Sequence, residues 1–138
     1  MSSLVGERIK VMQTLKAQSN AKDGVAEDGV GVDRTGFHSA VLAFNLGAAS
    51  GTPTSYTAAV KLQESDDNAS FSDVSGQALA LTDADEDTLS LLDAIDLRGL
   101  KQYIRATVTV TFTGGTSPEA VYACNIILGD ADAEPVSY

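Results

Sequence analysis

The chain offers few side chains that could do catalytic chemistry. His38 is its single histidine, and Ser39 follows it directly. Adjacent residues on a strand point to opposite faces, so this serine and this histidine cannot form a nucleophile–base pair. Cys124 is the single cysteine and lies in the apolar run 121–128, where a thiol behaves as a small buried hydrophobic side chain. A Cys124–His38–Asp triad stays open, but no spacing places it. We expect that the protein is not an enzyme and binds no cofactor.

A metal site is the other chemistry that the sequence raises. Residues 83–87 read DADED and begin like a calcium-binding loop, with acids at loop positions 1, 3 and 5. The pattern then fails, because position 6 is Thr88 instead of glycine and position 12 is Ala94 instead of glutamate. No segment has the paired cysteines or histidines of a zinc site. We predict no metal site, with calcium bound by the three aspartates of residues 83–87 as the alternative.

Length and composition indicate one soluble domain. The chain has 138 residues, enough to build one hydrophobic core without metal ions or disulfides. A single cysteine allows no intrachain disulfide, and the first residues, MSSLVGERIKVMQ, contain no apolar core of signal-peptide length. No apolar stretch approaches the roughly 20 residues that span a membrane. We therefore expect synthesis in the cytoplasm without export, and no membrane partner.

The net charge of -10 is concentrated in one third of the chain. Between Glu64 and Asp96 there are ten acidic residues and no lysine or arginine, whereas residues 1–22 carry four basic residues and one acidic residue. Such acidity repels nucleic acid, so we expect no nucleic-acid partner. We interpret the acidic stretch as a solvated face.

Residues 56–74 predict a β-hairpin. Apolar and polar residues alternate from Tyr56 to Leu62, which is the period of a half-buried strand. The turn formers of residues 65–68 (Ser-Asp-Asp-Asn) then reverse the chain, and Phe71 and Val74 return to the core.

The same alternation predicts the remaining strands. The clearest is residues 103–112, in which Ile104 and every second residue after it face the core. Residues 88–95 fit a helix through Leu91 and Ile95 or a strand through Leu89 and Leu91, and we favour the strand. Further strands are expected at residues 37–46 as a central strand, at 77–81, and at 120–128 as a strand buried on both faces.

Roughly seven or eight short strands separated by turns indicate an all-β fold, namely an antiparallel β-sandwich or a jelly roll in a single domain. We assign the sandwich to residues 23–138. Residues 1–22 are expected to form an extended N-terminal arm, since their β-branched residues suit a strand or an extended segment better than a helix.

Two similar six-residue segments each precede a long strand. Residues 32–37 read VDRTGF and residues 95–100 read IDLRGL, so both have the order apolar, Asp, two variable residues, Gly, apolar. Aspartate at the first position and glycine at the fourth position suit a type I turn. The match is either a true pseudo-repeat or two unrelated turns of a common kind.

Three segments carry a family resemblance. They are VKLQESDDNASFSDV, DLRGLKQYIRATVTVT and, after a glycine-rich hairpin, AVYACNIILGDADAEPV. Together they resemble small β-sandwich proteins encoded among the head genes of tailed bacteriophages and prophages, over about residues 35–136. The resemblance implies an auxiliary capsid protein that decorates or cements the shell, binds the major capsid protein and self-associates, often as a trimer. It carries over no site residue, and residues 1–33 fit the pattern poorly.

A second resemblance is to discoidin-type carbohydrate-binding β-sandwiches. It rests on the Ser-Asp-Asp turn, on Phe71 and Val74, and on the later run Tyr103-Ile104-Arg105. Those modules bind through aromatic loops and commonly contain tryptophan and a terminal disulfide, whereas this chain has no tryptophan and one cysteine. Glycan binding therefore ranks second, beside a phage tail structural protein.

The resulting prediction is a virion structural protein on the capsid exterior, assembled as a homotrimer. Arg8, Lys10 and Lys16 of the N-terminal arm are the predicted contacts to the capsid or to a neighbouring subunit. The acidic hairpin tip 65–70 and the loop 82–87 are expected to point away from the shell, because acidic surfaces repel one another when salt does not screen them.

Overall fold

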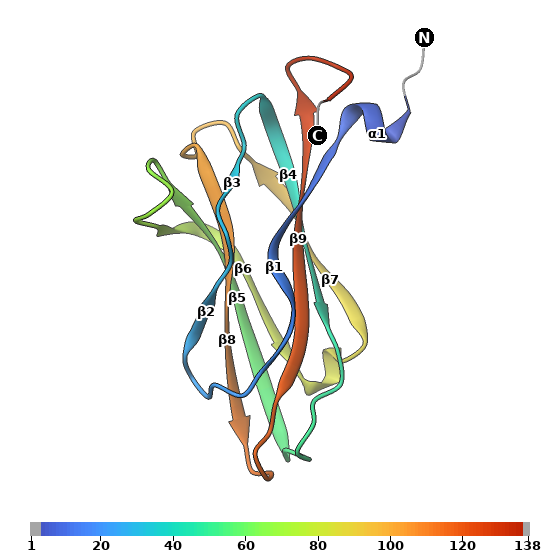
Figure 1. Ribbon diagram of the computed structural model, residues 1–138, viewed down its shortest axis with the longest axis vertical. Helices are drawn as coiled ribbons and strands as arrows, with labels where there is room; N and C mark the ends of the chain where they lie inside the picture. The colour runs from blue at the N-terminus through green and yellow to red at the C-terminus, as the bar shows by residue number, and fades with distance from the viewer. Residues whose placement is uncertain (1–3, 137–138) are drawn as a thin grey trace.

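The computed structural model describes residues 4–136, which form two β-sheets packed face to face (Figure 1). The predicted antiparallel β-sandwich is confirmed. Helical structure in the described residues is limited to one turn, α1 (Val5–Arg8), and a short 3-10 helix, η1 (Asp83–Asp85). Neither has the length and apolar character of a membrane-spanning helix. The strands are β1 (Lys10–Asn20), β2 (Ala26–Asp28), β3 (Val32–Asp33), β4 (Phe37–Leu46), β5 (Ser55–Ser65), β6 (Ser72–Thr82), β7 (Thr88–Asp96), β8 (Tyr103–Thr113) and β9 (Ala120–Ala131).

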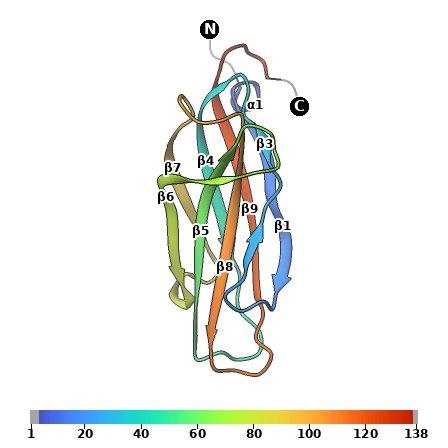
Figure 2. The ribbon, with the colours of Figure 1, turned by 90° about the vertical axis from the view of Figure 1, so that its left-hand side faces the viewer.

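The strand order is that of a jelly roll. Sheet A has the order β1-β9-β4-β7. Sheet B has the order β2-β8-β5-β6, and β3 continues the edge beyond β2 by pairing with the same strand, β8. Figure 2 shows sheet B toward the viewer with sheet A behind it. All these pairings are antiparallel, as the alternating pattern with one buried side requires.

The pairs nest like one long hairpin. β5 pairs with β6 at the centre, β4 with β7 outside it, β2 and β3 with β8 next, and β1 with β9 at the ends. The hairpin predicted at residues 56–74 is confirmed, and its tip is the midpoint of this two-stranded ribbon. Because the ribbon bends between the sheets, successive pairs alternate between sheet B and sheet A.

Alternate residues of both sheets fill the core between them. Leu42 and Phe44 of sheet A and Val60 and Val108 of sheet B are all fully buried. The rings of Phe44 and Tyr122 stack, with their centroids 5.7 Å apart, which adds to the area that they bury.

The ambiguous segment 88–95 is a strand. It lies within β7, where Leu92 and Ile95 pack on the core and the backbone pairs with β4. The segment 77–81 is the second half of a longer strand, β6. In β8, Thr107 lies on the outer side of sheet B, as the alternation predicts, but it is buried there between its neighbours in β2 and β5.

Strand β9 buries one side, not two. Tyr122, Cys124 and Ile126 are buried, whereas Val121, which directly precedes Tyr122, is exposed. The prediction of burial on both faces was wrong. α1 contacts β9 at one end of sheet A.

Residues 10–20 of the predicted arm form β1, an edge strand of sheet A. β1 pairs with β9 from Lys10–Leu128 to Asn20–Ala120, and its Leu15 belongs to the core. The sandwich therefore begins at residue 10 and not at residue 23. Of the arm, residues 4–9 lie outside the sheets, and residues 1–3 lie outside the described residues.

The two similar six-residue segments form the same turn. In each, the aspartate (Asp33 or Asp96) accepts a hydrogen bond from the backbone N–H two residues later. The glycines, Gly36 and Gly99, have φ angles of 88° and 92°. The N–H of Phe37 donates to the carbonyl of Arg34, and that of Leu100 to the carbonyl of Leu97, so each turn begins one residue after the aspartate and the glycine is its third residue. Glycine with positive φ at this position is typical of a type II turn, so the predicted type I turn was wrong. Both turns lie where the ribbon passes between the sheets, from β3 to β4 and from β7 to β8.

Thr14 closes one side of the sandwich. Its hydroxyl donates to the carbonyl of Val30 at 2.9 Å and accepts from the N–H of Ala106 at 3.1 Å. Its own carbonyl accepts from the N–H of Val30 at 2.7 Å. A Cβ atom at Gly29 would lie 2.5 Å from the Thr14 hydroxyl, so this approach requires glycine.

Candidate functional site

The outer side of sheet A carries a group of exposed apolar side chains. Val11, Leu89, Leu91 and Val121 point outward from it and are 45%, 57%, 46% and 42% exposed. Contiguous apolar surface on a small domain marks a place where another molecule binds. We call this surface the apolar face, and its residues are Val11, Val41, Ala43, Leu89, Leu91, Val121, Ala123 and Ile127.

The strand register arranges these side chains in rows. Val11 pairs with Ile127, which pairs with Val41, so one aliphatic row crosses β1, β9 and β4. Leu91 of the edge strand β7 lies beside Ala43, the small residue opposite it on β4. The face therefore has two exposed leucines along β7, one of them next to a small alanine on β4.

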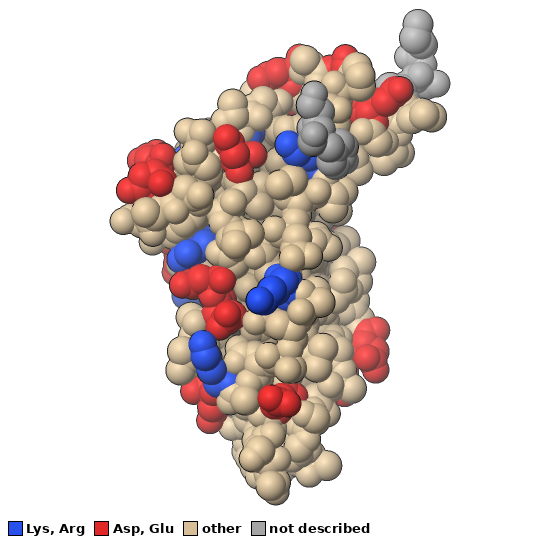
Figure 3. All heavy atoms as spheres, viewed as in Figure 1, with Lys and Arg blue, Asp and Glu red and all other residues tan. Residues whose placement is uncertain are grey.

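The outer side of sheet B is different in chemistry. Its outward residues on β5 and β8 are mainly polar: Thr57, Lys61, Gln63, Arg105, Thr109 and Thr111. Figure 3 shows this contrast: uncharged atoms predominate along the right-hand flank, formed by sheet A, and most charged atoms lie elsewhere in the view. The two sides of the sandwich are thus suited to different surroundings.

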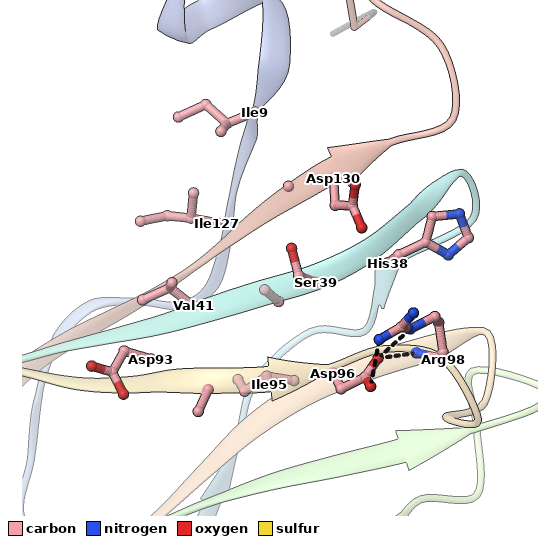
Figure 4. Close-up of a pocket in the computed structure, with 13 residues that line it drawn as sticks. Ile9, His38, Ser39, Val41, Asp93, Ile95, Asp96, Arg98, Ile127 and Asp130 are labelled. Atoms are coloured by element: carbon pink, nitrogen blue, oxygen red, sulfur yellow. Dashed lines mark hydrogen bonds and ion pairs between the residues drawn. The ribbon is translucent and has the colours of Figure 1, made fainter.

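A shallow depression lies at one end of the apolar face (Figure 4). Its aliphatic side is formed by Ile9, Val41 and Ile127, and its polar side includes the ion pair of Asp96 with Arg98. The Asp96 carboxylate accepts from the Nε of Arg98 at 3.0 Å, and these hydrogen bonds lower the pKa of Asp96. Because both partners are exposed, the pair contributes little to stability.

His38 lies at the edge of this depression but meets no nucleophile. Its Nε2 is hydrogen-bonded to the carboxylate of Asp132, and its Nδ1 is buried without a partner in the described part of the chain. Ser39 points to the outer side of the sheet, as its pairing with Gly129 requires. The side chains of His38 and Ser39 thus diverge, as the strand geometry predicts.

Cys124 is remote from His38. Its partner on β4 is Phe44, six residues along the strand from His38, or about 20 Å at the rise of a β-strand. Burial raises the pKa of the Cys124 thiol to about 12, so it stays protonated at neutral pH. The Cys124–His38–Asp triad is not assembled.

The three aspartates of residues 83–87 lie in and next to η1. Asp85 accepts from the backbone N–H of Thr82 at 2.9 Å and so caps the 3-10 helix. The neighbouring Glu86 accepts from the hydroxyl of Tyr56 at 2.7 Å and from the N–H of Ala49 at 3.2 Å. Among residues 4–136 no cluster of three acidic, histidine or cysteine side chains could hold a metal ion. The carboxylates of Asp85 and Glu86 instead fix the loop.

The three predicted contact residues do not form one patch. Arg8 is exposed at the end of α1, next to Asp130 and Glu134. Lys10 begins β1. Against the opposing effect of burial, hydrogen bonds from Thr35 lower the pKa of Asp33, and the charge of Lys10 adds a smaller lowering effect. Lys16 is exposed near the middle of β1. The three cations are therefore spread along one edge of the sandwich.

The two acidic loops lie at opposite ends of the molecule. They precede and follow the same 11-residue strand, β6, and the hairpin tip 65–70 lies at the end that carries α1 (Figure 1). A contact made by the α1 end would leave only the η1 loop pointing away. The two loops were expected to point together away from the shell. In the structure they do not point in one direction.

Sequence reasoning missed the apolar face, although its signal was present. In the runs 37–46 and 120–128 both parities are apolar, which was interpreted as burial on two sides. The same pattern arises when one apolar side faces the core and the other faces a second molecule. In β7, Leu89 and Leu91 are likewise apolar residues on the side that does not face the core.

No protein-family model matches the chain, and no curated protein sequence matches it. Among solved structures, the crystal structure of the PBSX exported protein XepA matches with a TM-score of 0.59 and 18% sequence identity, over 100% of this chain and 42% of XepA. The structure of infectious bursal disease virus, Gx strain, aligns with a TM-score of 0.40 and 11% identity, over 93% of this chain and 33% of that one. The chain thus spans less than half of XepA, with which it shares a fold.

Proposed function

We propose that this chain is a structural protein of a tailed-phage particle, which decorates the capsid and stabilises it by binding major capsid subunits. The observation that carries the proposal is the apolar face, because a domain that works alone rarely leaves four large aliphatic side chains exposed on one sheet. Further support comes from the sequence resemblance to head-decoration proteins and from the fold shared with a phage exported protein, XepA.

A decoration protein stabilises a capsid when many copies of it bind to the repeating lattice of capsid subunits. Each copy needs only weak contacts, because many copies on neighbouring subunits gain affinity by avidity. In this proposal the apolar face serves assembly, and Arg8, Lys10 and Lys16 on the β1 edge contact the shell. A negatively charged shell surface would attract these cations, of which Arg8 and Lys16 are exposed and Lys10 is half-buried.

Glycan binding finds no supporting observation in the structure. A carbohydrate site commonly offers an exposed aromatic ring, but every aromatic side chain among residues 4–136 is buried or half-buried. Phe71, one of the half-buried rings, is covered by the guanidinium of Arg105 at 4.0 Å from its centroid. A tail structural protein remains the second candidate, and the experiment below separates it from a head protein.

Co-sedimentation with purified phage heads and with purified tails tests the proposal. The wild-type chain should bind heads at saturating copy number and should not bind tails. Recovery with tails alone would contradict the head assignment, and binding to neither would contradict the virion role.

The contact residues are tested by charge reversal. Arg8→Glu, Lys10→Glu and Lys16→Glu combined should lower head occupancy at least tenfold. The matched control reverses three other exposed lysines, Lys22, Lys61 and Lys101, which make surface ion pairs. If both triple variants lose occupancy equally, general charge and not the β1 edge directs binding.

A further inference from the structure

We infer that the apolar face binds the apolar face of a second copy of this chain, forming a two-fold pair. The inference concerns how copies associate, and it does not depend on whether they bind a capsid. It is argued from the charge, the relief and the area of the face.

The distribution of charge lets two acidic copies meet through this face. The chain carries a net charge of -10, so most pairings of its surface bring carboxylates together. Among the apolar residues of the face, the outward positions Gln13, Asn45 and Asn125 are uncharged. The acidic residues Asp87, near Leu89 and Val121, and Asp93, near Val41 and Ile127, are both exposed, so they can keep contact with water at the rim.

The relief of the face allows it to pair with itself. Leu89 and Leu91 are exposed on the edge strand β7, and Ala43, the partner of Leu91 on β4, is a small residue. A two-fold axis uses the same surface on both copies, so the leucines of each copy can pack over the smaller side chains of the other copy.

The outer side of sheet A, which consists of the apolar face and the polar residues among it, offers sufficient area for such a pair. Four strands spaced by about 4.8 Å and some eight residues of about 3.3 Å each give roughly 500 Å² per copy, or about 1,000 Å² for the pair. This is near the lower limit for a specific interface, so the pair should form reversibly. A single apolar face used in this way gives two copies, whereas the homotrimer expected from the sequence needs two different surfaces.

Sedimentation equilibrium over a range of concentrations tests the pairing. The wild-type mass should rise from one copy to two and no further. Leu89→Glu combined with Leu91→Glu should remain a single copy throughout, because each pair would then bury four carboxylates. Both leucines are exposed, so circular dichroism and the melting temperature should stay close to wild type.

The matched control carries the same charge change elsewhere. Val25→Glu combined with Val30→Glu alters two valines that are 52% and 65% exposed and that lie outside the apolar face. This variant should pair like the wild type. A wild type that stays a single copy, a mass of three copies, or undiminished pairing of the Leu89/Leu91 variant would overturn the inference.

Binding to phage heads separates this inference from the proposed function. Pairing in solution without binding to heads would refute the capsid role and leave the pair intact. A wild type that never pairs, together with loss of head binding in the Leu89/Leu91 variant, would show that the face binds the capsid instead.

Discussion

The Nε atom of Arg34 donates a hydrogen bond to the carbonyl oxygen of Lys101 at 3.2 Å, and its guanidinium also donates to the carbonyl of Leu100. Arg34 lies in the first of the two matching turns, and Leu100 and Lys101 follow the second. The contact thus holds together the two strands of the ribbon where both bend from one sheet to the other.

Replacing Arg34 with alanine should lower the free energy of unfolding by about 1–2 kcal/mol, because the two carbonyls lose a charged donor. Arg98→Ala is the control, since Arg98 is exposed and its side chain is hydrogen-bonded to Asp96 two residues away. That change should cost less than about 0.5 kcal/mol. Urea denaturation measures both, and equal effects would show that the corner contact adds no stability.

Gly36→Ala and Gly99→Ala should each destabilise the fold by about 1–2 kcal/mol, because an L-residue is strained at positive φ. There is open space around both glycines, so strain and not a clash is the cause. Gly129→Ala is the control: its new Cβ would meet only the Ser39 hydroxyl at an ordinary 3.5 Å, and its φ is not positive. Thermal unfolding measures the stability of all three variants. Widely different losses in Gly36→Ala and Gly99→Ala would contradict the conclusion that both glycines lie in the same kind of turn.

Thr14→Val keeps the shape of the side chain and removes its hydroxyl. The carbonyl of Val30 and the N–H of Ala106 would each lose a partner in a buried place, at a cost of about 1–3 kcal/mol. Thr111→Val, on the exposed outer side of β8, should be nearly neutral. Hydrogen exchange of the Ala106 amide gives a direct reading, since its protection should fall in the first variant and not in the second.

Stability should fall above pH 9 because of Cys124. Burial raises the pKa of its thiol from 9.0 to about 12, so the folded state holds the proton more tightly than the unfolded state. This stabilisation is complete below pH 9 and is lost as the pH rises toward 12. Between pH 9 and pH 10 the loss should be about 1 kcal/mol. Cys124→Ala should be less stable at pH 7 but should not show this decline, and an unchanged decline would assign it to the tyrosines.

Period-two alternation predicted which segments are strands because a half-buried strand imposes that period on its own residues. It worked best where one side faces water, as in residues 56–62. It could not pair the strands, because the partner of Lys10 is Leu128, at the far end of the chain, and no local pattern encodes such a distance. The assignment of residues 10–20 to an arm failed for this reason.

The apolar face could not be predicted from the sequence, for a related reason. A sequence shows that Leu89, Leu91 and Val121 are apolar, but not whether their side of the sheet is covered. The matching turns at Gly36 and Gly99 were recognised as a motif. Their proximity emerged only from the path of the ribbon, which brings the two corners together.

The nested pairing also sets the order in which the molecule can fold. The pair β5–β6 joins neighbours in sequence, and each further pair closes a longer loop, up to β1 with β9. Closing long loops costs entropy before the contacts repay it, so folding should start at the central hairpin, spread outward and be slow for a chain of this length. During synthesis, β1 leaves the ribosome first yet has no strand partner until β9 is made. Sheet A, and with it the exposed aliphatic surface, is therefore the last part of the protein to form.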